Sequence, residues 1–145
     1  MALGVPWHAG EVVPQFEAHQ LSGRSIRSSE LAGRPILVVF WASWCPLCWG
    51  EMVELEKIYK RYKGSGLEIV AISLDSERQD AVDYMRSVQP VSFPVAMGDD
   101  RHVEIFGPLL VPPRMFLIGR DGRLVSRHWG VMRPKVLDAT IRGAI

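Results

Sequence analysis

The sequence predicts an α/β fold in which a central mixed β-sheet lies between helices. Three observations lead to this prediction. The segment at 36–41 is wholly apolar, as in a strand that is buried on both faces. Downstream of it, segments with helical spacing alternate with short apolar runs, and an Asp-Gly pair at 121–122 marks a turn between two such runs. The length of 145 residues suits a single domain, which we expect to span 1–145.

The composition argues against several classes of protein. The chain is 48% hydrophobic and 23% charged with a formal net charge of +1, as in an ordinary soluble domain, so a nucleic-acid partner is not expected. The longest apolar run, Ile36 to Ala42, is far shorter than the ~20 residues of a membrane-spanning helix. No signal peptide is visible at the start, which predicts a cytoplasmic protein unless an export signal or anchor is missing from this sequence.

The first predicted element is a short edge hairpin in an N-terminal extension of about residues 10–32. Phe16, Leu21 and Ile26 flank Ser22-Gly23-Arg24, which has the residue types of a tight turn. The core of the domain, about residues 33–145, then begins with the buried strand.

A long helix is predicted after Pro46, followed by a second strand and a second helix. The apolar positions of the first helix recur at helical spacing, and its charged positions, Glu51 among them, are placed on the opposite face. The helix ends near the glycines at 64–66. Leu67 to Leu74 forms the second strand, and Ser76 is the expected cap of a helix that reaches about Val88.

The last third of the chain predicts a hairpin and a final helix. Met115 to Ile118 and Arg123 to Trp129 are apolar runs on either side of the Gly119-to-Gly122 turn. Pro134 suits the first turn of a helix. The predicted order is therefore βαβ followed by ββα, with parallel pairing in the first half and antiparallel pairing in the second.

The two cysteines, Cys45 and Cys48, lie at the junction between the buried strand and the long helix. A helix N-terminus favours an anion, and the first thiol of a Cys-x-x-Cys motif at such an end can titrate at ~3.5–7.5 instead of ~8.5. Cys48 follows by almost one helical turn, so its sulfur can reach Cys45. We therefore expect Cys45 to be the nucleophile and Cys48 the resolving thiol of disulfide exchange.

Three alternatives to this reading are a zinc site, a pair of inert buried thiols and a peroxidase. The histidines do not form a ligand pair with metal-binding spacing, and no metal is expected; they are His8, His19, His102 and His128. The position of the pair at a strand end, beside Pro46, argues against inert thiols. Peroxidases of the peroxiredoxin type carry Thr or Ser three residues before the attacking cysteine, where this chain has Ala42.

Four segments carry a resemblance to a known family. Gly10 to Phe16 is similar to a G-x-x-A-P-x-F opening, Leu31 to Pro35 to L-x-G-K-P, Phe40 to Cys48 to F-W-A-x-W-C-P-x-C, and Val111 to Gly122 to x-P-x-T-F-L-I-D-x-x-G. The chain thus resembles thioredoxin-fold proteins, and more narrowly the TlpA/ResA-type thiol-disulfide oxidoreductases of the redoxin group. The resemblance covers most of the chain and implies a thioredoxin-like three-layer α/β/α sandwich.

The resemblance also implies further site residues. Pro113 falls on the cis-proline of the family, and Pro112 before it is expected to line the substrate groove together with Trp44, Pro46 and Leu47. An X-Pro bond tolerates the cis form, which turns the backbone beside the cysteines toward an incoming peptide. Such an apolar surface suits a protein substrate. Trp41 is expected in the core, and Trp49 suits either the surface or the interior.

The sequence departs from the family pattern at the position of a buried acid. Many thioredoxins have an Asp just before the Phe-Trp pair that accepts the proton of the second cysteine, and here that residue is Val39. ResA-like members have a Glu after the second strand, where this chain has Ser76 between Asp75 and Glu77. Glu77 is therefore the candidate for proton transfer, although an acid in a first helical turn more often complements the helix dipole.

The expected function is a protein-disulfide reductase that works without cofactor through the Cys45–Cys48 pair. The resemblance implies an extracytoplasmic protein, often membrane-tethered, that reduces exported proteins or cysteines for cytochrome c maturation. Its expected partners are protein thiols or disulfides and an upstream thioredoxin-like or membrane electron donor, and a monomer is expected. Two other functions remain open at this point: a redoxin-type peroxidase, and a thioredoxin-fold binding or chaperone module.

Overall fold

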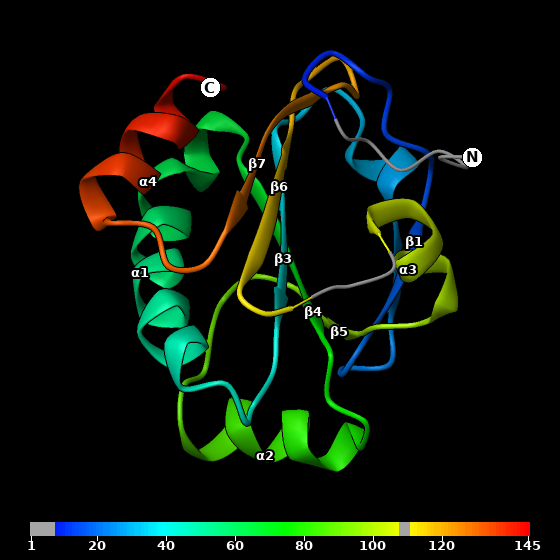
Figure 1. The fold of residues 1–145 in the computed structure, drawn as a ribbon, viewed down its shortest axis with the longest axis vertical. Helices are drawn as coiled ribbons and strands as arrows, with labels where there is room; N and C mark the ends of the chain where they lie inside the picture. Colours follow the sequence, from blue (N-terminus) through cyan, green and yellow to red (C-terminus); the bar gives the residue numbers. More distant parts are fainter. Residues whose placement is uncertain (1–7, 108–110) are drawn as a thin grey trace.

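The computed structural model describes residues 8–107 and 111–145. In this part of the chain a single seven-stranded mixed sheet has the strand order β2-β1-β5-β4-β3-β6-β7 (Figure 1). The strands are β1 (Glu17–Gln20), β2 (Ser25–Arg27), β3 (Ile36–Trp41), β4 (Glu68–Ser73), β5 (Val95–Met97), β6 (Arg114–Ile118) and β7 (Leu124–Trp129). The helices are α1 (Pro46–Tyr62), α2 (Arg78–Ser87), α3 (Asp100–Phe106) and α4 (Pro134–Arg142), with 3-10 turns at Ser28–Leu31 and Lys63–Ser65.

The central strand is β3, as its apolar sequence predicts. All of its residues are buried, because helices cover both faces of the sheet. It pairs in parallel with β4, where Phe40 lies opposite Ile72, and antiparallel with β6, where Phe40 lies opposite Arg114. The parallel first half and the antiparallel second half of the predicted topology are both confirmed.

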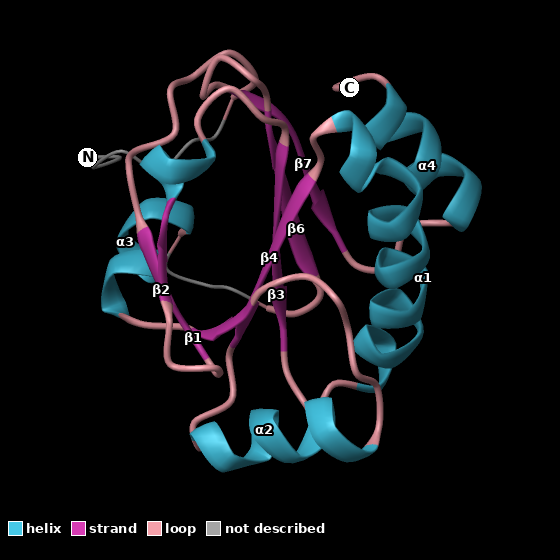
Figure 2. Ribbon diagram, turned by 180° about the vertical axis from the view of Figure 1, so that it is seen from behind, coloured by secondary structure: helices cyan, strands magenta, loops and turns pink. Residues whose placement is uncertain are grey.

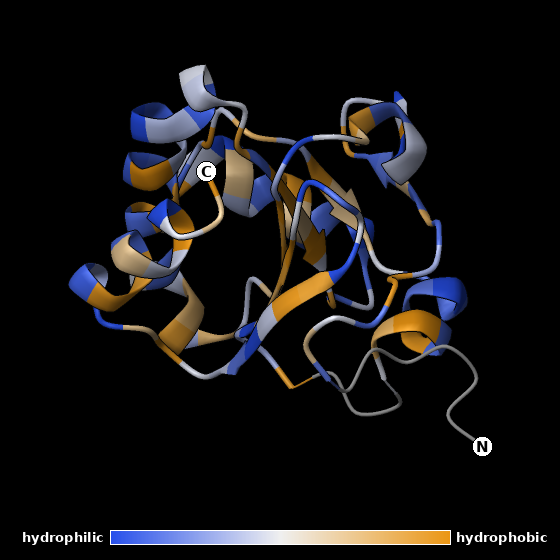
Figure 3. Cartoon of the chain, turned by 90° about the horizontal axis from the view of Figure 1, so that it is seen from above, coloured by the Kyte–Doolittle hydropathy of each residue, from blue (hydrophilic) through white to orange (hydrophobic). Residues whose placement is uncertain are grey.

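Helices cover the two faces of the sheet, so the molecule has three layers (Figure 2). Residues of α1, α2 and α4 form one hydrophobic core with one face of β3, and residues of α3 form the other core with the opposite face. Apolar residues concentrate on the strands and alternate with polar residues around the helices (Figure 3). The predicted three-layer α/β/α sandwich is confirmed.

Aromatic rings fill the core between α3 and the sheet. Phe106 of α3 packs edge-on against Phe40 and Phe16, with ring centroids 5.3 Å apart in both pairs, and its ring lies 4.9 Å from that of Phe116. Such pairs add to the free energy of burial. The short helix therefore covers one face of the sheet with Ile105 and with the ring of Phe106, which packs against three other rings.

The predicted N-terminal hairpin is confirmed and adds two strands to the sheet. β1 pairs antiparallel with β2, and its other edge pairs with β5. Neither β5 nor α3 is predicted by the sequence pattern, because they have three and seven residues and a proline, Pro94, interrupts the apolar run before β5. The capping carboxylate of Asp99, which accepts from the His102 N–H at 3.0 Å, is the signal that marks α3.

The start of the second helix differs from the predicted one. The second helix begins at Arg78 with Glu77 at its N-cap, so the prediction that Ser76 caps it is wrong. The turn of the last hairpin is built as predicted, with Gly122 at a φ of 80° that favours glycine. Within the described residues, none of the helices has both the length and the apolar character needed to cross a membrane.

Candidate active site

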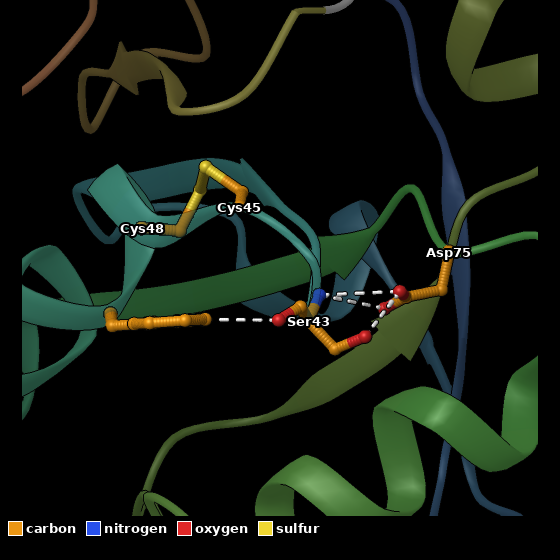
Figure 4. Close-up of a disulfide and its surroundings, with 5 residues drawn as sticks. Ser43, Cys45, Cys48 and Asp75 are labelled. Atoms are coloured by element: carbon orange, nitrogen blue, oxygen red, sulfur yellow. Dashed lines mark hydrogen bonds between the residues drawn. A yellow bond between two sulfur atoms is a disulfide. The ribbon is translucent and has the colours of Figure 1, made fainter.

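The two cysteines lie at the carboxyl end of the central strand. β3 ends at Trp41, a short loop follows, and Cys45 is the N-cap residue of α1 with Pro46 in the first helical turn. Cys45 and Cys48 form a disulfide with their Cα atoms 5.3 Å apart (Figure 4). Their exposed fractions are 5% and 1%, so little of either residue is open to solvent.

The helix N-terminus provides the electrostatic setting of Cys45. Its backbone is extended rather than helical, and it forms no side-chain cap bond. The first turn of α1 contains no acidic residue that would oppose a negative charge there, whereas the unpaired N–H groups and the helix dipole favour one. A thiolate on the first cysteine is therefore stabilised when the disulfide is reduced.

A cis peptide bond joins Pro112 to Pro113. Pro113 is buried and Pro112 is half-buried. The next residue, Arg114, lies opposite Phe40 in the register of β3 and β6, so the cis bond is at the end of the sheet from which the cysteine loop leaves. The Gly130 N–H donates to the Pro113 carbonyl at 2.9 Å and ties this turn to the end of β7. The cis isomer implied by the resemblance is present.

Apolar side chains near the cysteines are unusually exposed. Trp44 and Leu47, on either side of Cys45, are 61% and 62% exposed, and Pro46 between them is exposed as well. Trp49 is 46% exposed, whereas Trp41 is fully buried in the core as expected. The structure thus brings three of the predicted groove residues together on the loop and first turn that carry the disulfide.

Glu77, the predicted proton acceptor, lies at the exposed N-cap of α2. A different carboxyl group is buried on the helix that carries Cys48. Glu51 is 2% exposed and lies one turn of α1 after Cys48, although the helical pattern placed it on the polar face. That placement is wrong, and the role of Glu77 stays a prediction.

The environment of Glu51 favours its protonated form. Burial raises the pKa of this carboxyl to about 7; the Met132 N–H opposes the rise and the charge of Glu54 adds to it. Its Oε1 accepts a long bond of 3.4 Å from the Met132 N–H, and its Oε2 is buried without a hydrogen-bond partner. An acid with a pKa near neutrality is suited to exchange a proton during a reaction at physiological pH.

One signal in the sequence points to Glu51. It shares the spacing of the buried stripe of α1, three residues after Cys48 and four before Leu55. A charged residue on the apolar side of a helix, one turn from a reactive thiol, is a reason to test for a proton-transfer role.

A second group not predicted from the sequence is Arg114, a buried cation immediately after the cis proline. It is 2% exposed, and its guanidinium stacks on Trp129 at 3.7 Å and on Phe116 at 4.8 Å. Among the described residues, its Nη1 has no hydrogen-bond partner. Burial, together with repulsion from Arg127, lowers its pKa to about 10. A charged residue at the start of an apolar strand, directly after two prolines, is the sequence signal of this arrangement.

Other features of the structure lie away from the cysteines. A cavity of about 210 Å³ is lined by Val13, Phe16, Ile36 and Ile118, at the end of the sheet opposite the disulfide. Across residues 8–107 and 111–145, no cluster of three or more His, Cys, Asp or Glu side chains is arranged to hold a metal ion.

Comparison with known proteins places this site in a family. The redoxin family model matches residues 8–143. The thiol-disulfide oxidoreductase ResA of Bacillus cereus is 32% identical over 135 residues, which cover 92% of this chain and 76% of that protein. ResA of Bacillus subtilis is 30% identical over 128 residues, covering 88% and 71%.

Solved structures show the same fold. A Chlorobium tepidum protein, provisionally described as the thiol:disulfide interchange protein DsbE, superposes with a TM-score of 0.84 at 27% identity, covering 94% of this chain and 97% of that one. A second thiol:disulfide interchange protein of the thioredoxin family from Chlorobium tepidum has a TM-score of 0.85 at 23% identity, covering 92% and 94%. With the matching family model, the strand-end disulfide and the cis proline, the chain belongs to the redoxin family and is similar to its ResA-type thiol-disulfide oxidoreductases.

Proposed function

We propose that this protein is a thiol-disulfide oxidoreductase that reduces disulfides in protein substrates. The observation that carries the proposal is the Cys45–Cys48 disulfide at the N-terminus of α1, in a chain about 30% identical to ResA proteins. The helix end stabilises the thiolate needed for attack, and the second thiol is within bonding distance of the first.

The reaction has two exchanges. In the reduced protein the Cys45 thiolate attacks one sulfur of the substrate disulfide, forms a mixed disulfide and releases the other substrate sulfur as a thiolate, which takes a proton. Cys48 then loses its proton and attacks the Cys45 sulfur. The mixed disulfide breaks and the second substrate sulfur leaves as a thiolate. The protein keeps the Cys45–Cys48 disulfide until a dithiol donor reduces it.

Glu51 is the proton acceptor that the buried position of Cys48 requires. The thiol is 1% exposed, so water has little access to its proton, and the carboxyl group lies one turn along the same helix. The unpartnered Oε2 can take the proton when Glu51 is ionised, which a pKa near 7 permits for a sizeable fraction of molecules at neutral pH. Glu77 remains a weaker candidate because it is exposed.

The exposed apolar residues around the disulfide form the substrate surface of this proposal. Trp44, Pro46 and Leu47 border Cys45, and the half-buried Pro112 with the cis Pro113 stands at the same end of the sheet. An apolar surface of this kind matches an unfolded or flexible segment of a protein better than a small charged disulfide.

The similarity to ResA also supports a place for the reaction. We infer an extracytoplasmic protein that reduces exported proteins, among them cysteines for cytochrome c maturation, and receives electrons from a thioredoxin-like or membrane donor. The protein acts as a monomer and without cofactor in this proposal.

The test is reduction of a disulfide-bonded protein, such as insulin, by the reduced protein. Reduction is expected with the natural chain, no reaction with Cys45→Ser, and a stable mixed disulfide with Cys48→Ser, visible by mass and released by dithiothreitol. If Cys48→Ser forms no mixed disulfide with the substrate, the assigned roles of the two cysteines are contradicted. If the protein consumes hydrogen peroxide faster than it reduces protein disulfides, it is a peroxidase. If the natural chain exchanges no disulfides and Cys45→Ser binds a partner as well as the natural chain does, the protein is a binding module.

A further inference from the structure

Ser43, two residues before the attacking cysteine, has all of its polar groups bound. Its N–H and its hydroxyl both donate to the carboxylate of Asp75, the N–H at 3.1 and 3.2 Å to the two oxygens and the hydroxyl at 2.6 Å (Figure 4). Its carbonyl accepts from the indole N–H of Trp49 at 3.0 Å. We call the three residues Asp75, Ser43 and Trp49 the Ser43 clamp.

Asp75 anchors the clamp to the sheet. It lies just beyond the end of β4 and is 6% exposed. Its carboxylate also accepts from the Ser73 hydroxyl at 2.6 Å, and its own N–H donates to that hydroxyl at 3.0 Å. A buried carboxylate with this many donors is held firmly in place, because each bond that is lost leaves one of its buried oxygens with fewer donors.

Trp49 closes the clamp on the helical side. It directly follows Cys48. The indole bond to the Ser43 carbonyl therefore joins the two ends of a seven-residue segment, 43–49, that contains both cysteines. The disulfide is a covalent bond inside this segment, and the indole bond is a second, non-covalent closure that involves neither sulfur.

We propose that the Ser43 clamp positions the two thiols of the reduced protein, so that Cys48 stays within reach of Cys45 during the second exchange. This inference rests on the proposed function and deepens it. Holding two reacting groups together raises their effective concentration and lowers the entropy that ring closure costs. The clamp residues touch neither sulfur in this role; they act through the loop backbone, and are positioning residues.

The clamp has a predictable effect on equilibrium and rate. Without it, the dithiol gains freedom that the disulfide lacks, so the equilibrium constant for forming the disulfide falls. Resolution of the mixed disulfide slows for the same reason. Since one hydrogen bond of this kind contributes a factor of about two to ten, loss of the indole bond should change both quantities by about that factor.

A matched control lies elsewhere in the chain. Glu56 accepts from the N–H of Ser92 at 2.8 Å and from its hydroxyl at 2.6 Å, the same carboxylate–serine pattern as in the clamp. It joins α1 to the loop before β5 and does not enclose the cysteines. Glu56→Gln thus perturbs the same type of contact without perturbing the proposed function of the clamp.

The experiment compares Trp49→Phe, Asp75→Asn, the double variant and Glu56→Gln by equilibration with glutathione buffers. The redox state is read by the mass added on alkylation, since tryptophan fluorescence is altered in Trp49→Phe. Acid-quenched reactions with glutathione disulfide give the rate at which the mixed disulfide resolves. Trp49→Phe keeps an aromatic ring and all charges while removing the indole N–H, so it remains informative if Asp75→Asn does not fold.

We expect Trp49→Phe to lower the disulfide-forming equilibrium constant and the resolution rate by about twofold to tenfold, and Glu56→Gln to leave both unchanged. The double variant should lose no more than the larger single effect, because both residues act through Ser43. Values for Trp49→Phe within 1.5-fold of the natural chain, or equal effects in Glu56→Gln, overturn the inference. The proposed function fails separately, if the natural chain closes its disulfide with glutathione yet reduces no protein.

Discussion

The buried carboxyl of Glu51 should make the stability of the protein depend on pH in a specific way. A pKa of about 7 in place of the ordinary 4.5 means that the ionised group is less favourable in the folded protein than in the unfolded chain. At ~1.4 kcal/mol per pH unit the difference amounts to about 3 kcal/mol. Glutamine has nearly the same shape and no charge, so Glu51→Gln removes this penalty.

The direction of the effect follows from proton binding. Between pH 4.5 and 7 the folded state holds the Glu51 proton while the unfolded chain has lost it, so the stability of the natural chain falls as the pH rises through this range. Below about pH 4.5 the penalty is absent in both proteins. Above about pH 7 the penalty is fully present in the natural chain. The free energy of unfolding of Glu51→Gln minus that of the natural chain should therefore be about 3 kcal/mol larger above pH 7 than at pH 4.

The assay is urea unfolding of the oxidised natural chain and of Glu51→Gln at pH values from 4 to 9. The free energies of unfolding are subtracted at each pH, so that the contributions of all other titrating groups cancel. A difference that does not change with pH would refute the buried, near-neutral carboxyl. In the same variant we expect slower resolution of the mixed disulfide at pH 7, and the same measurement on Glu77→Gln tests the weaker, exposed candidate.

Three further predictions concern the substrate surface and the core. Trp44→Ala should lower kcat/KM for a protein disulfide about tenfold, because exposed aromatic residues dominate such contacts, while leaving the rate with glutathione disulfide within about twofold; equal losses with both substrates would contradict a protein-binding role. Arg114→Met should leave the stability measured in urea within about 1 kcal/mol or raise it, because the lost stacking is offset by removal of a buried cation without a partner at Nη1; a loss above about 3 kcal/mol would show that the cation is needed. Phe106→Ala should cost about 3–5 kcal/mol, because this ring joins Phe16, Phe40 and Phe116, and a loss under about 1 kcal/mol would contradict that packing.

Most of the fold follows from local sequence patterns. The strand Ile36–Trp41 is predicted residue by residue because burial on both faces leaves no position for a polar side chain. The Asp-Gly turn and the hairpin around it are equally local. By contrast, β5 with three residues and α3 with seven are too short for a periodic pattern, and long-range contacts such as the ring packing of Phe106 hold α3 in place.

In the candidate site too, some features follow from adjacent residues and others depend on residues far apart in the sequence. The placement of Cys45 and Cys48 follows from a motif at a strand–helix junction, which adjacent residues define. The burial of Glu51 depends on the segment after β7, whose Met132 N–H meets its carboxylate from 81 residues away. The contact between Ser43 and Asp75 likewise spans 32 residues. Local sequence patterns contain no information about such distant partners, so neither the contact of Glu51 with Met132 nor that of Ser43 with Asp75 can be predicted from them.

The reduction potential of the Cys45–Cys48 pair tests the central claim most directly. The protein is equilibrated against glutathione buffers of known ratio, and the fraction with the disulfide is measured by alkylation and mass. A protein-disulfide reductase is expected to have a value near the ~−270 mV of thioredoxin, since its dithiol must give electrons to the substrate. A value near the ~−120 mV of DsbA would mean an oxidant that forms disulfides, and a pair that stays reduced in every buffer would contradict a redox function.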